Sequence, residues 1–278
     1  MARAVSRIVV GALACAVAVF AGAAEPLFPS PLHITRQVHD PLSNTTVVLD
    51  EYGYGNRLVS VRGAKTSIAD YERGELTEID RDTATYSITR FDAIAKATQA
   101  IGAVANENAQ ATTALARPRA LRSLGVKATA HGRNADFFES EVEAKELRQK
   151  VEVGVDRSAT VSREALEVLL GAAYPGVRRA EHDLVLSAAA PQRSSVATNA
   201  NESRTSLYAL PVEQSTTIEL DGQSLSFRTS VVRVGSEAPP ADAVAIPAGA
   251  RLVTSRLVAV QNELELFNRP ASSVPDVH

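Results

Sequence analysis

The chain has 278 residues, a formal net charge of −3, one cysteine and no tryptophan. A balance this close to neutrality disfavours proteins that bind nucleic acid or anionic membranes, because such surfaces carry an excess of basic residues. The absence of tryptophan also weakens a carbohydrate-binding interpretation, since sugar sites usually offer a flat aromatic platform. Cys15 lies in a segment that we expect to be removed, so neither disulfides nor thiol chemistry are expected in the mature protein.

The first 24 residues have the pattern of a secretory signal peptide. Arg3 and Arg7 precede an apolar run that ends in small residues, and residues 21–23 fit an A-x-A cleavage site. The run is too short for a retained membrane anchor, and Cys15 lacks the leucine-led box that lipid attachment requires. Removing the two arginines lowers the basic residues from 29 to 27 against 32 acidic ones, a net charge of −5. No later apolar run could span a membrane, and the composition predicts a periplasmic or secreted bacterial protein.

Residues 45–90 read as short β-prone runs separated by Gly, Asn and Asp. This alternation of strands and turns indicates an antiparallel meander in which sequential strands pair. Gly74 lies in the loop over 72–75, where a hairpin needs a positive φ. The strands predicted in this part of the chain cover 32–38, 47–52, 58–61, 67–71, 76–79 and 84–90.

From Phe91 the chain becomes rich in alanine, and the spacing of Ile94, Ile101 and Val104 predicts a helix over 92–118. Its apolar stripe is weak, so we interpret it as a mobile insert, either a surface helix or a lid. Ser162 is expected to cap a second helix that stops at Pro175-Gly176.

The remaining elements follow from the same patterns. Strands are predicted over 121–130, 137–142, 147–155, 180–188, 207–212, 216–220 and 223–234, and a helix near 252–267. The polar residues near 189–205 predict a mobile loop. No repeat or linker divides the chain, so we expect a 24-residue leader followed by a single α+β domain over 25–278.

The usual signatures of catalysis and metal binding are missing. Asp80 and Asp82 begin like a calcium loop, but Ala84 and Thr85 stand where a ligand and the required glycine belong. The nucleophile elbow, the zinc-protease helix, the phosphate loop and the dinucleotide glycine motif are absent. The five histidines have no metal-ligand spacing; they are His33, His39, His131, His182 and His278. No catalytic residue, cofactor or metal is therefore predicted.

Two clusters of side chains have simple structural interpretations. Glu139, Glu141 and Glu143 alternate along a predicted strand, which favours a solvated charged face over an acid–base pair. Four tyrosines of the meander either line the mouth of an apolar cavity or pack across strands, and packing is favoured. These tyrosines are Tyr52, Tyr54, Tyr71 and Tyr86.

Two stretches resemble a known family. The first carries Asn56, Arg57, Asp70, Gly74, Asp80, Thr85 and Tyr86; the second runs over 229–250 and closes on Ile246-Pro247-Ala248-Gly249. Together, over 32–90 and 207–250, they resemble the exported proteins related to outer-membrane lipoprotein-sorting carriers. Val244 and Ala250 stand where that family has aromatic residues. The resemblance implies a strongly curved antiparallel sheet, a half-barrel, with helices packed on its concave face and a cavity that binds acyl chains.

The resulting hypothesis is a non-enzymatic periplasmic binding protein that holds a lipid or lipoprotein acyl chain, with an envelope protein as a further partner. Two alternatives stay open: an exported structural or interaction protein without a small ligand, and a hydrolase whose nucleophile the sequence does not reveal. Alternation alone assigns the cavity face to Val47, Leu49, Val59, Val61, Tyr86 and Ile88.

Overall fold

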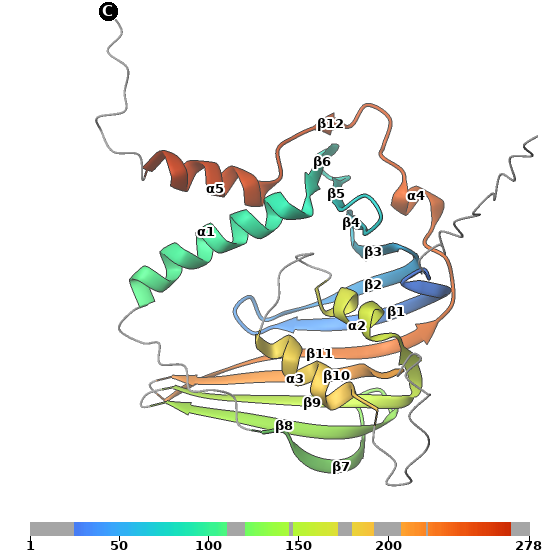
Figure 1. The fold of residues 1–278 in the computed structure, drawn as a ribbon, viewed down its shortest axis with the longest axis vertical. Helices are drawn as coiled ribbons and strands as arrows, with labels where there is room; N and C mark the ends of the chain where they lie inside the picture. The colour runs from blue at the N-terminus through green and yellow to red at the C-terminus, as the bar shows by residue number, and fades with distance from the viewer. Residues whose placement is uncertain are drawn as a thin grey trace, which may run out of the picture.

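The computed structural model describes residues 25–109, 120–144, 147–171, 180–191, 207–220 and 222–267. Within this part of the chain, one sheet of twelve strands carries the fold (Figure 1), in the order β12-β6-β5-β4-β3-β2-β1-β11-β10-β9-β8-β7. Neighbouring strands are antiparallel except at the edge, where β12 runs parallel to β6. The predicted α+β class with an antiparallel sheet is confirmed.

The strands are β1 (Phe28–Asp40), β2 (Thr45–Gly55), β3 (Arg57–Arg62), β4 (Lys65–Asp70), β5 (Glu75–Asp80), β6 (Thr85–Arg90), β7 (Arg122–Ala128), β8 (Asn134–Ala144), β9 (Leu147–Val161), β10 (Tyr208–Leu220), β11 (Gln223–Gly235) and β12 (Arg251–Leu252). The helices are α1 (Phe91–Ala109), α2 (Arg163–Leu170), α3 (Ala180–Ala189), α4 (Ala241–Val244) and α5 (Arg256–Phe267).

The meander predicted over 45–90 is confirmed, and its turns have the expected chemistry. Asp70 Oδ1 accepts the backbone N–H of Arg73 at 3.0 Å, and Asp80 Oδ1 accepts that of Asp82 at 3.0 Å. Gly74 has a φ of 66°, a left-handed conformation that glycine adopts without steric cost. These aspartates close tight turns between sequential strands, so strands β2 to β6 pair in chain order.

The sheet is neither closed nor strongly curled, which differs from the predicted half-barrel. Its edges, β7 and β12, stand at opposite ends of the strand order. Strong curvature comes from bulges and glycine kinks repeated along a sheet. The pairings from β2 to β6 contain no register shift, so the meander twists without curling.

Three helices share one face of the sheet, which we call the helical face. Buried residues of α2 and α3 pack on Val151, Val153 and Val155 of β9. The first turns of α1 pack on Ala69 and Leu76 of β4 and β5. The strand registers place these apolar residues on the same side, because directly opposed residues share a face. Helix α5 runs alongside α1 (Figure 1), and Leu257 in its first turn packs against the same cluster.

The prediction of a strand over 180–188 is wrong, because this segment forms helix α3. Its Leu-Val-Leu run suits either element, but alanine and glutamate around the run favour a helix. Strand β9, on which this segment packs, already pairs with β8 and β10 and has no free side for another strand. Val185, Leu186, Ala188 and Ala189 are instead buried against β9 and β10.

The other predicted helices are confirmed, with described bounds that differ from the predicted ones. Helix α1 begins at Phe91 and is described to Ala109, and α5 begins at Arg256. Ser162 caps α2 by accepting the N–H of Ala165 at 3.0 Å, and the helix ends at Leu170, ahead of the predicted stop. The leader, the end of the insert and most of the loop near 189–205 lie outside the described residues. No helix of the described part is long and apolar enough to cross a membrane.

The face opposite the helices is crossed by the segment between β11 and β12, residues 236–250. Glu237 at its start contacts His33, and Arg81 donates to the carbonyl oxygens of Asp242 and Ala243 at 2.5 and 2.7 Å. The same guanidinium donates to Thr66 at 2.9 Å, a residue on this face of β4. The segment therefore covers β3 to β5 on this side and delivers β12 to β6 (Figure 1).

Candidate functional site

An apolar pocket of about 490 Å³ lies where the chain enters the sheet. One wall is the lead-in and start of β1, over residues 25–32. The other wall is the end of β9 and the first turn of α2, with Leu207 closing one side. The apolar lining comes from Pro26, Leu27, Phe28, Pro29, Pro31, Leu32, Val161, Ala165 and Leu207.

The sequence at the start of β1 explains why a pocket forms there. Phe28 pairs with Gly55 and Leu32 pairs with Gly53, so β1 has two more residues than β2 between these pairs. The additional residues belong to the segment Pro29-Ser30-Pro31, whose prolines have no N–H to donate to a neighbouring strand. The strand therefore bulges, and the bulged segment forms the lip of the pocket.

Two contacts fix this entry segment on the sheet. The backbone N–H of Leu27 donates to Asn56 Oδ1 at 3.0 Å. The Phe28 ring packs directly on Gly53, where an added Cβ would lie 2.5 Å from Phe28 Cδ1. Gly53 is thus needed for the close approach of the ring, and Phe28 is buried at the base of the pocket wall.

The polar groups around the pocket define what it could hold. Ser162 Oγ already accepts the N–H of Ala165, so the helix cap is occupied. Glu25 and Glu164 are exposed carboxylates at the rim. Apolar walls favour a hydrocarbon group, and the Glu164 carboxylate repels an anionic end of such a ligand. The pocket is suited to an apolar chain whose outer end is neutral or cationic.

The six residues assigned to the cavity face by alternation do not lie together. Directly opposed pairs place Val59, Val61, Tyr86 and Ile88 on the face crossed by residues 236–250. Val47 and Leu49 point to the helical face, because their neighbour Asp50 opposes Val61. Val59 is fully buried, whereas the Ile88 side chain is 51% exposed. The pocket at the start of β1 contains none of the six.

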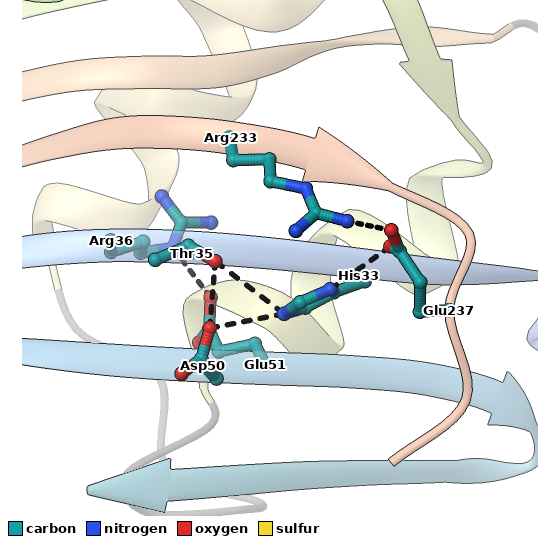
Figure 2. A network of polar contacts seen from close by, with 7 residues as sticks. All are labelled: His33, Thr35, Arg36, Asp50, Glu51, Arg233 and Glu237. Carbon is teal, nitrogen blue, oxygen red and sulfur yellow. Dashed lines mark hydrogen bonds and ion pairs between the residues drawn. The ribbon is translucent and has the colours of Figure 1, made fainter. Parts of the chain in front are cut away.

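A buried polar network lies on β1, on the face of the sheet that residues 236–250 cross (Figure 2). His33 is 7% exposed and stacks on Tyr52. Its Nε2 lies 3.0 Å from Asp50 Oδ1, and its Nδ1 lies 3.1 Å from Glu237 Oε2. Thr35 donates to Asp50 at 2.7 Å, and Arg233 pairs with Glu237. Both ring nitrogens thus face carboxylates, and only the imidazolium form can donate to both.

This network bears on the hydrolase alternative, which requires a nucleophile activated by histidine. Thr35 Oγ1 lies 3.4 Å from His33 Nε2, farther than Asp50, and the hydroxyl donates to that carboxylate. His33 is held between two acids and is not aimed at a hydroxyl, unlike the base of a nucleophilic triad. The contact of His33 with Glu237 instead joins residues 236–250 to the sheet.

The tyrosines of the meander pack as cross-strand partners or on helices. Tyr71 packs edge-on against Phe91, with ring centroids 5.1 Å apart, and burial raises the pKa of Tyr71 to about 12. Burial, followed by the nearby Asp50 charge, also raises the pKa of Tyr52. Tyr54 and Tyr86 are partly exposed on the strands of the meander.

The alternating glutamates of β8 meet basic residues of the adjacent strands. Glu139 pairs with Arg122 and with Lys150, and Glu141 pairs with Arg148. Hydrogen bonding by Arg122 is the main cause that holds the pKa of Glu139 below its usual range. Glu139 and Glu141 belong to a cross-strand ladder of opposite charges, and the Glu139 side chain is less solvated than predicted, at 12% exposed. Among the described residues, no three His, Cys, Asp or Glu side chains gather in a group that could hold a metal ion.

Sequence reasoning did not find the pocket or the His33 network. Glu237 is 204 residues from His33, so spacing could not connect them. The signal for the pocket is local, because a Pro-Ser-Pro segment at the start of a strand predicts a bulge.

No family model matches the chain, and no curated protein matches it. Among solved structures, one described as PNGF-II in space group C2 is 8% identical, with a TM-score of 0.34. The alignment covers 85% of this chain and 33% of that one, so this chain spans about a third of the matched chain's length. A TM-score this low does not establish a shared fold, and no function is carried over. The resemblance to lipoprotein-sorting carriers stays a prediction.

Proposed function

We propose that the protein is an exported, non-enzymatic binding protein that holds an apolar chain in the pocket at the start of β1. The observation that carries this proposal is the lining of that pocket by proline, leucine, phenylalanine, valine and alanine side chains. Its volume of about 490 Å³ falls within the range of small-molecule sites. The signal-peptide pattern of residues 1–24 supports a periplasmic or secreted location.

The binding mechanism needs no reactive group. Burying hydrocarbon releases about 25 cal/mol for each Å² of apolar surface removed from water. The prolines of the lip hold the entry segment in one conformation, so little ordering entropy is lost on binding. Ser162 and Ala165 form a preformed floor, since the helix that carries them is already capped.

The rim narrows the class of ligand. Glu164 places negative charge where the ligand leaves the pocket, whereas Glu25 would stand beside the positive amino terminus that removal of the leader creates. A free fatty acid would bring its carboxylate near Glu164, whereas an ester- or amide-linked acyl chain presents a neutral end. We therefore propose the acyl chain of a lipid or lipoprotein as the ligand, with the envelope protein that carries or receives it as partner.

Native mass spectrometry of the mature protein purified from periplasm tests the proposal. We expect a copurified lipid that is lost on organic extraction. In a second arm, the extracted protein is titrated with two probes of equal chain length, a fatty acid and its methyl ester. The ester should bind more tightly than the acid. A clean protein mass together with no saturable binding of either probe would contradict the proposal and favour an interaction protein without a small ligand.

A variant locates the binding at this pocket. Leu207 lines the pocket and is 52% exposed, so Leu207→Asp should fold normally while placing a charge against the ligand. We expect ester affinity to fall about tenfold or more, from the loss of one leucine contact. Leu42→Asp is the matched control, because Leu42 is 72% exposed and lies outside the pocket lining. Equal effects of the two variants would place the binding elsewhere.

A further inference from the structure

A second cleft, of about 460 Å³, lies where β1, β2 and β11 meet the turn between β7 and β8. Its polar lining consists of Gln37, His39, Thr46, His131, Ser226, Arg228 and Ser230, and Ala130 completes it. No carboxylate contributes to this lining. The cleft therefore brings one permanent cation and two imidazoles together with several hydroxyl groups.

The strand registers make this convergence a property of the fold. Arg228 of β11 lies directly opposite His39 of β1, and His39 lies opposite Thr46 of β2. Two basic residues in a direct cross-strand pair repel each other when the histidine is protonated, and Asp40, which follows His39, offsets part of that charge. Within the described chain, Arg228 makes no ion pair.

The turn between β7 and β8 supplies the second histidine from a distant part of the sheet. His131 Nε2 lies 3.1 Å from Ser230 Oγ, although β8 and β11 are separated by β9 and β10. The backbone N–H of Ala130 donates to Glu213 Oε2 at 3.0 Å. These two bonds hold the turn over β10 and β11 and place the His131 imidazole at the cleft.

Two acidic groups, Glu213 and Asp40, lie beside the cleft without joining its lining. Glu213 accepts the N–H of Ala130, and Asp40 accepts from Ser43 Oγ and from the N–H of Leu42, with its pKa lowered chiefly by the Ser43 bond. Ser215 of β10 lies directly opposite Arg228, and Glu152 of β9 lies opposite Ser215. Glu152 is the first carboxylate reached in this direction across the sheet, two strands or about 10 Å away. The neutral donors to Glu213 and Asp40 do not remove the carboxylate charges, but no carboxylate lines the cleft, so the groups that face it are one guanidinium, two imidazoles and neutral polar side chains.

We propose that this cleft binds a tetrahedral oxyanion, the phosphate or sulfate group of a ligand. Arginine presents a fork of N–H donors that matches such oxygens, and imidazolium and hydroxyl groups complete the donor set. A divalent cation is disfavoured, because the Arg228 guanidinium would repel it. The site is independent of the apolar pocket, and neither proposal requires the other.

Titration of the mature full chain with inorganic phosphate, at fixed pH and ionic strength, tests the site. The imidazole resonances of His39 and His131 should shift together and saturate, with a dissociation constant in roughly the millimolar range. Parallel titrations with sulfate and with glycerol phosphate distinguish an inorganic ion from a phosphate ester, since tighter binding of the ester would identify the organic source.

Variants separate a site from general charge effects. Arg228→Gln should raise the dissociation constant about tenfold, through loss of a charge-assisted contact, while thermal stability stays unchanged. Arg62→Gln, an exposed arginine outside the cleft lining, should leave binding unaltered. The proposal is wrong if the two resonances do not saturate with any of the three anions, or if both arginine variants weaken binding equally.

Discussion

His33 and Tyr52 stack with ring centroids 4.2 Å apart and an interplanar angle of 15°. They lie directly opposite each other in the β1–β2 register, so the stack follows from strand pairing. The tyrosine fixes the plane of the imidazole, and that plane directs one ring nitrogen to Asp50 and the other to Glu237 (Figure 2). The stack on Tyr52 thereby orients the His33 imidazole, which binds Glu237 and so holds residues 236–250 against the sheet.

Replacing His33 should loosen this attachment. His33→Ala removes a buried group that contacts two carboxylates, and we expect the free energy of unfolding in urea to fall by about 2–3 kcal/mol. Backbone amides in 236–250 should exchange hydrogen faster in the variant, since Glu237 loses its partner on the sheet. Glu237→Gln should cost less than about 1 kcal/mol, because that side chain is half exposed. Unchanged exchange in His33→Ala would show that other contacts hold the segment.

Strands β1 and β2 also carry a buried ion pair on the helical face. Arg36 Nε lies 2.5 Å from Glu51 Oε2, and Glu51 is 3% exposed. Arg36→Met should destabilise the protein by about 3–5 kcal/mol, because it leaves a buried carboxylate without its partner. The double variant Arg36→Met/Glu51→Leu should recover most of that loss, since two apolar side chains fill a similar volume and leave no buried charge. Urea unfolding of both variants checks this, and a single variant that costs under about 1 kcal/mol would show that the pair is solvated.

Residues that act locally were accessible to sequence reasoning. Asp70, Gly74 and Asp80 predicted the turns of the meander, because their side chains and conformations act within three residues. Ser162 predicted the start of α2 for the same reason. The class of the fold follows from such elements, since sequential antiparallel strands need only short turns.

The shape of the sheet and the sites depend on contacts that no local pattern carries. Strand alternation assigns Leu49 and Val61 to faces only when the register between β2 and β3 is known, and a one-residue difference moves a side chain to the other face. Ala180–Ala189 could be either helix or strand until the partners of β9 were fixed. His33 and Glu237 meet because residues 236–250 cross the sheet, a path set by Arg81 and the carbonyl oxygens of α4.

Stability at alkaline pH should depend on Tyr71. Burial raises its pKa to about 12, whereas an unfolded tyrosine titrates near about 10. The folded state therefore holds the phenol proton more tightly, so this contribution is fully present below about pH 10 and is lost as the pH rises toward about 12. The slope should approach about 1.4 kcal/mol for each pH unit in that window.

Urea unfolding across the alkaline range measures this slope, and the ultraviolet absorbance of tyrosinate reports the titration directly. Tyr71→Phe should flatten the slope, because phenylalanine keeps the packing on Phe91 without an ionisable group. Tyr86→Phe, at a partly exposed ring, should leave the slope largely intact. A Tyr71→Phe variant with the wild-type slope would assign the pH dependence to other groups.

The close approach of Phe28 to Gly53 couples the stability of the sheet to the pocket. Gly53→Ala places a Cβ 2.5 Å from Phe28 Cδ1, within the ring's own volume, so the ring or the strand must move. We expect a loss of about 1–3 kcal/mol in the free energy of unfolding, as for other overpacked cores. Because Phe28 also lines the pocket, affinity for the acyl ester should fall in the same variant. Adding Phe28→Leu should restore part of the stability by removing the ring from the new methyl group, and a double variant less stable than Gly53→Ala alone would show that the clash is not with Phe28.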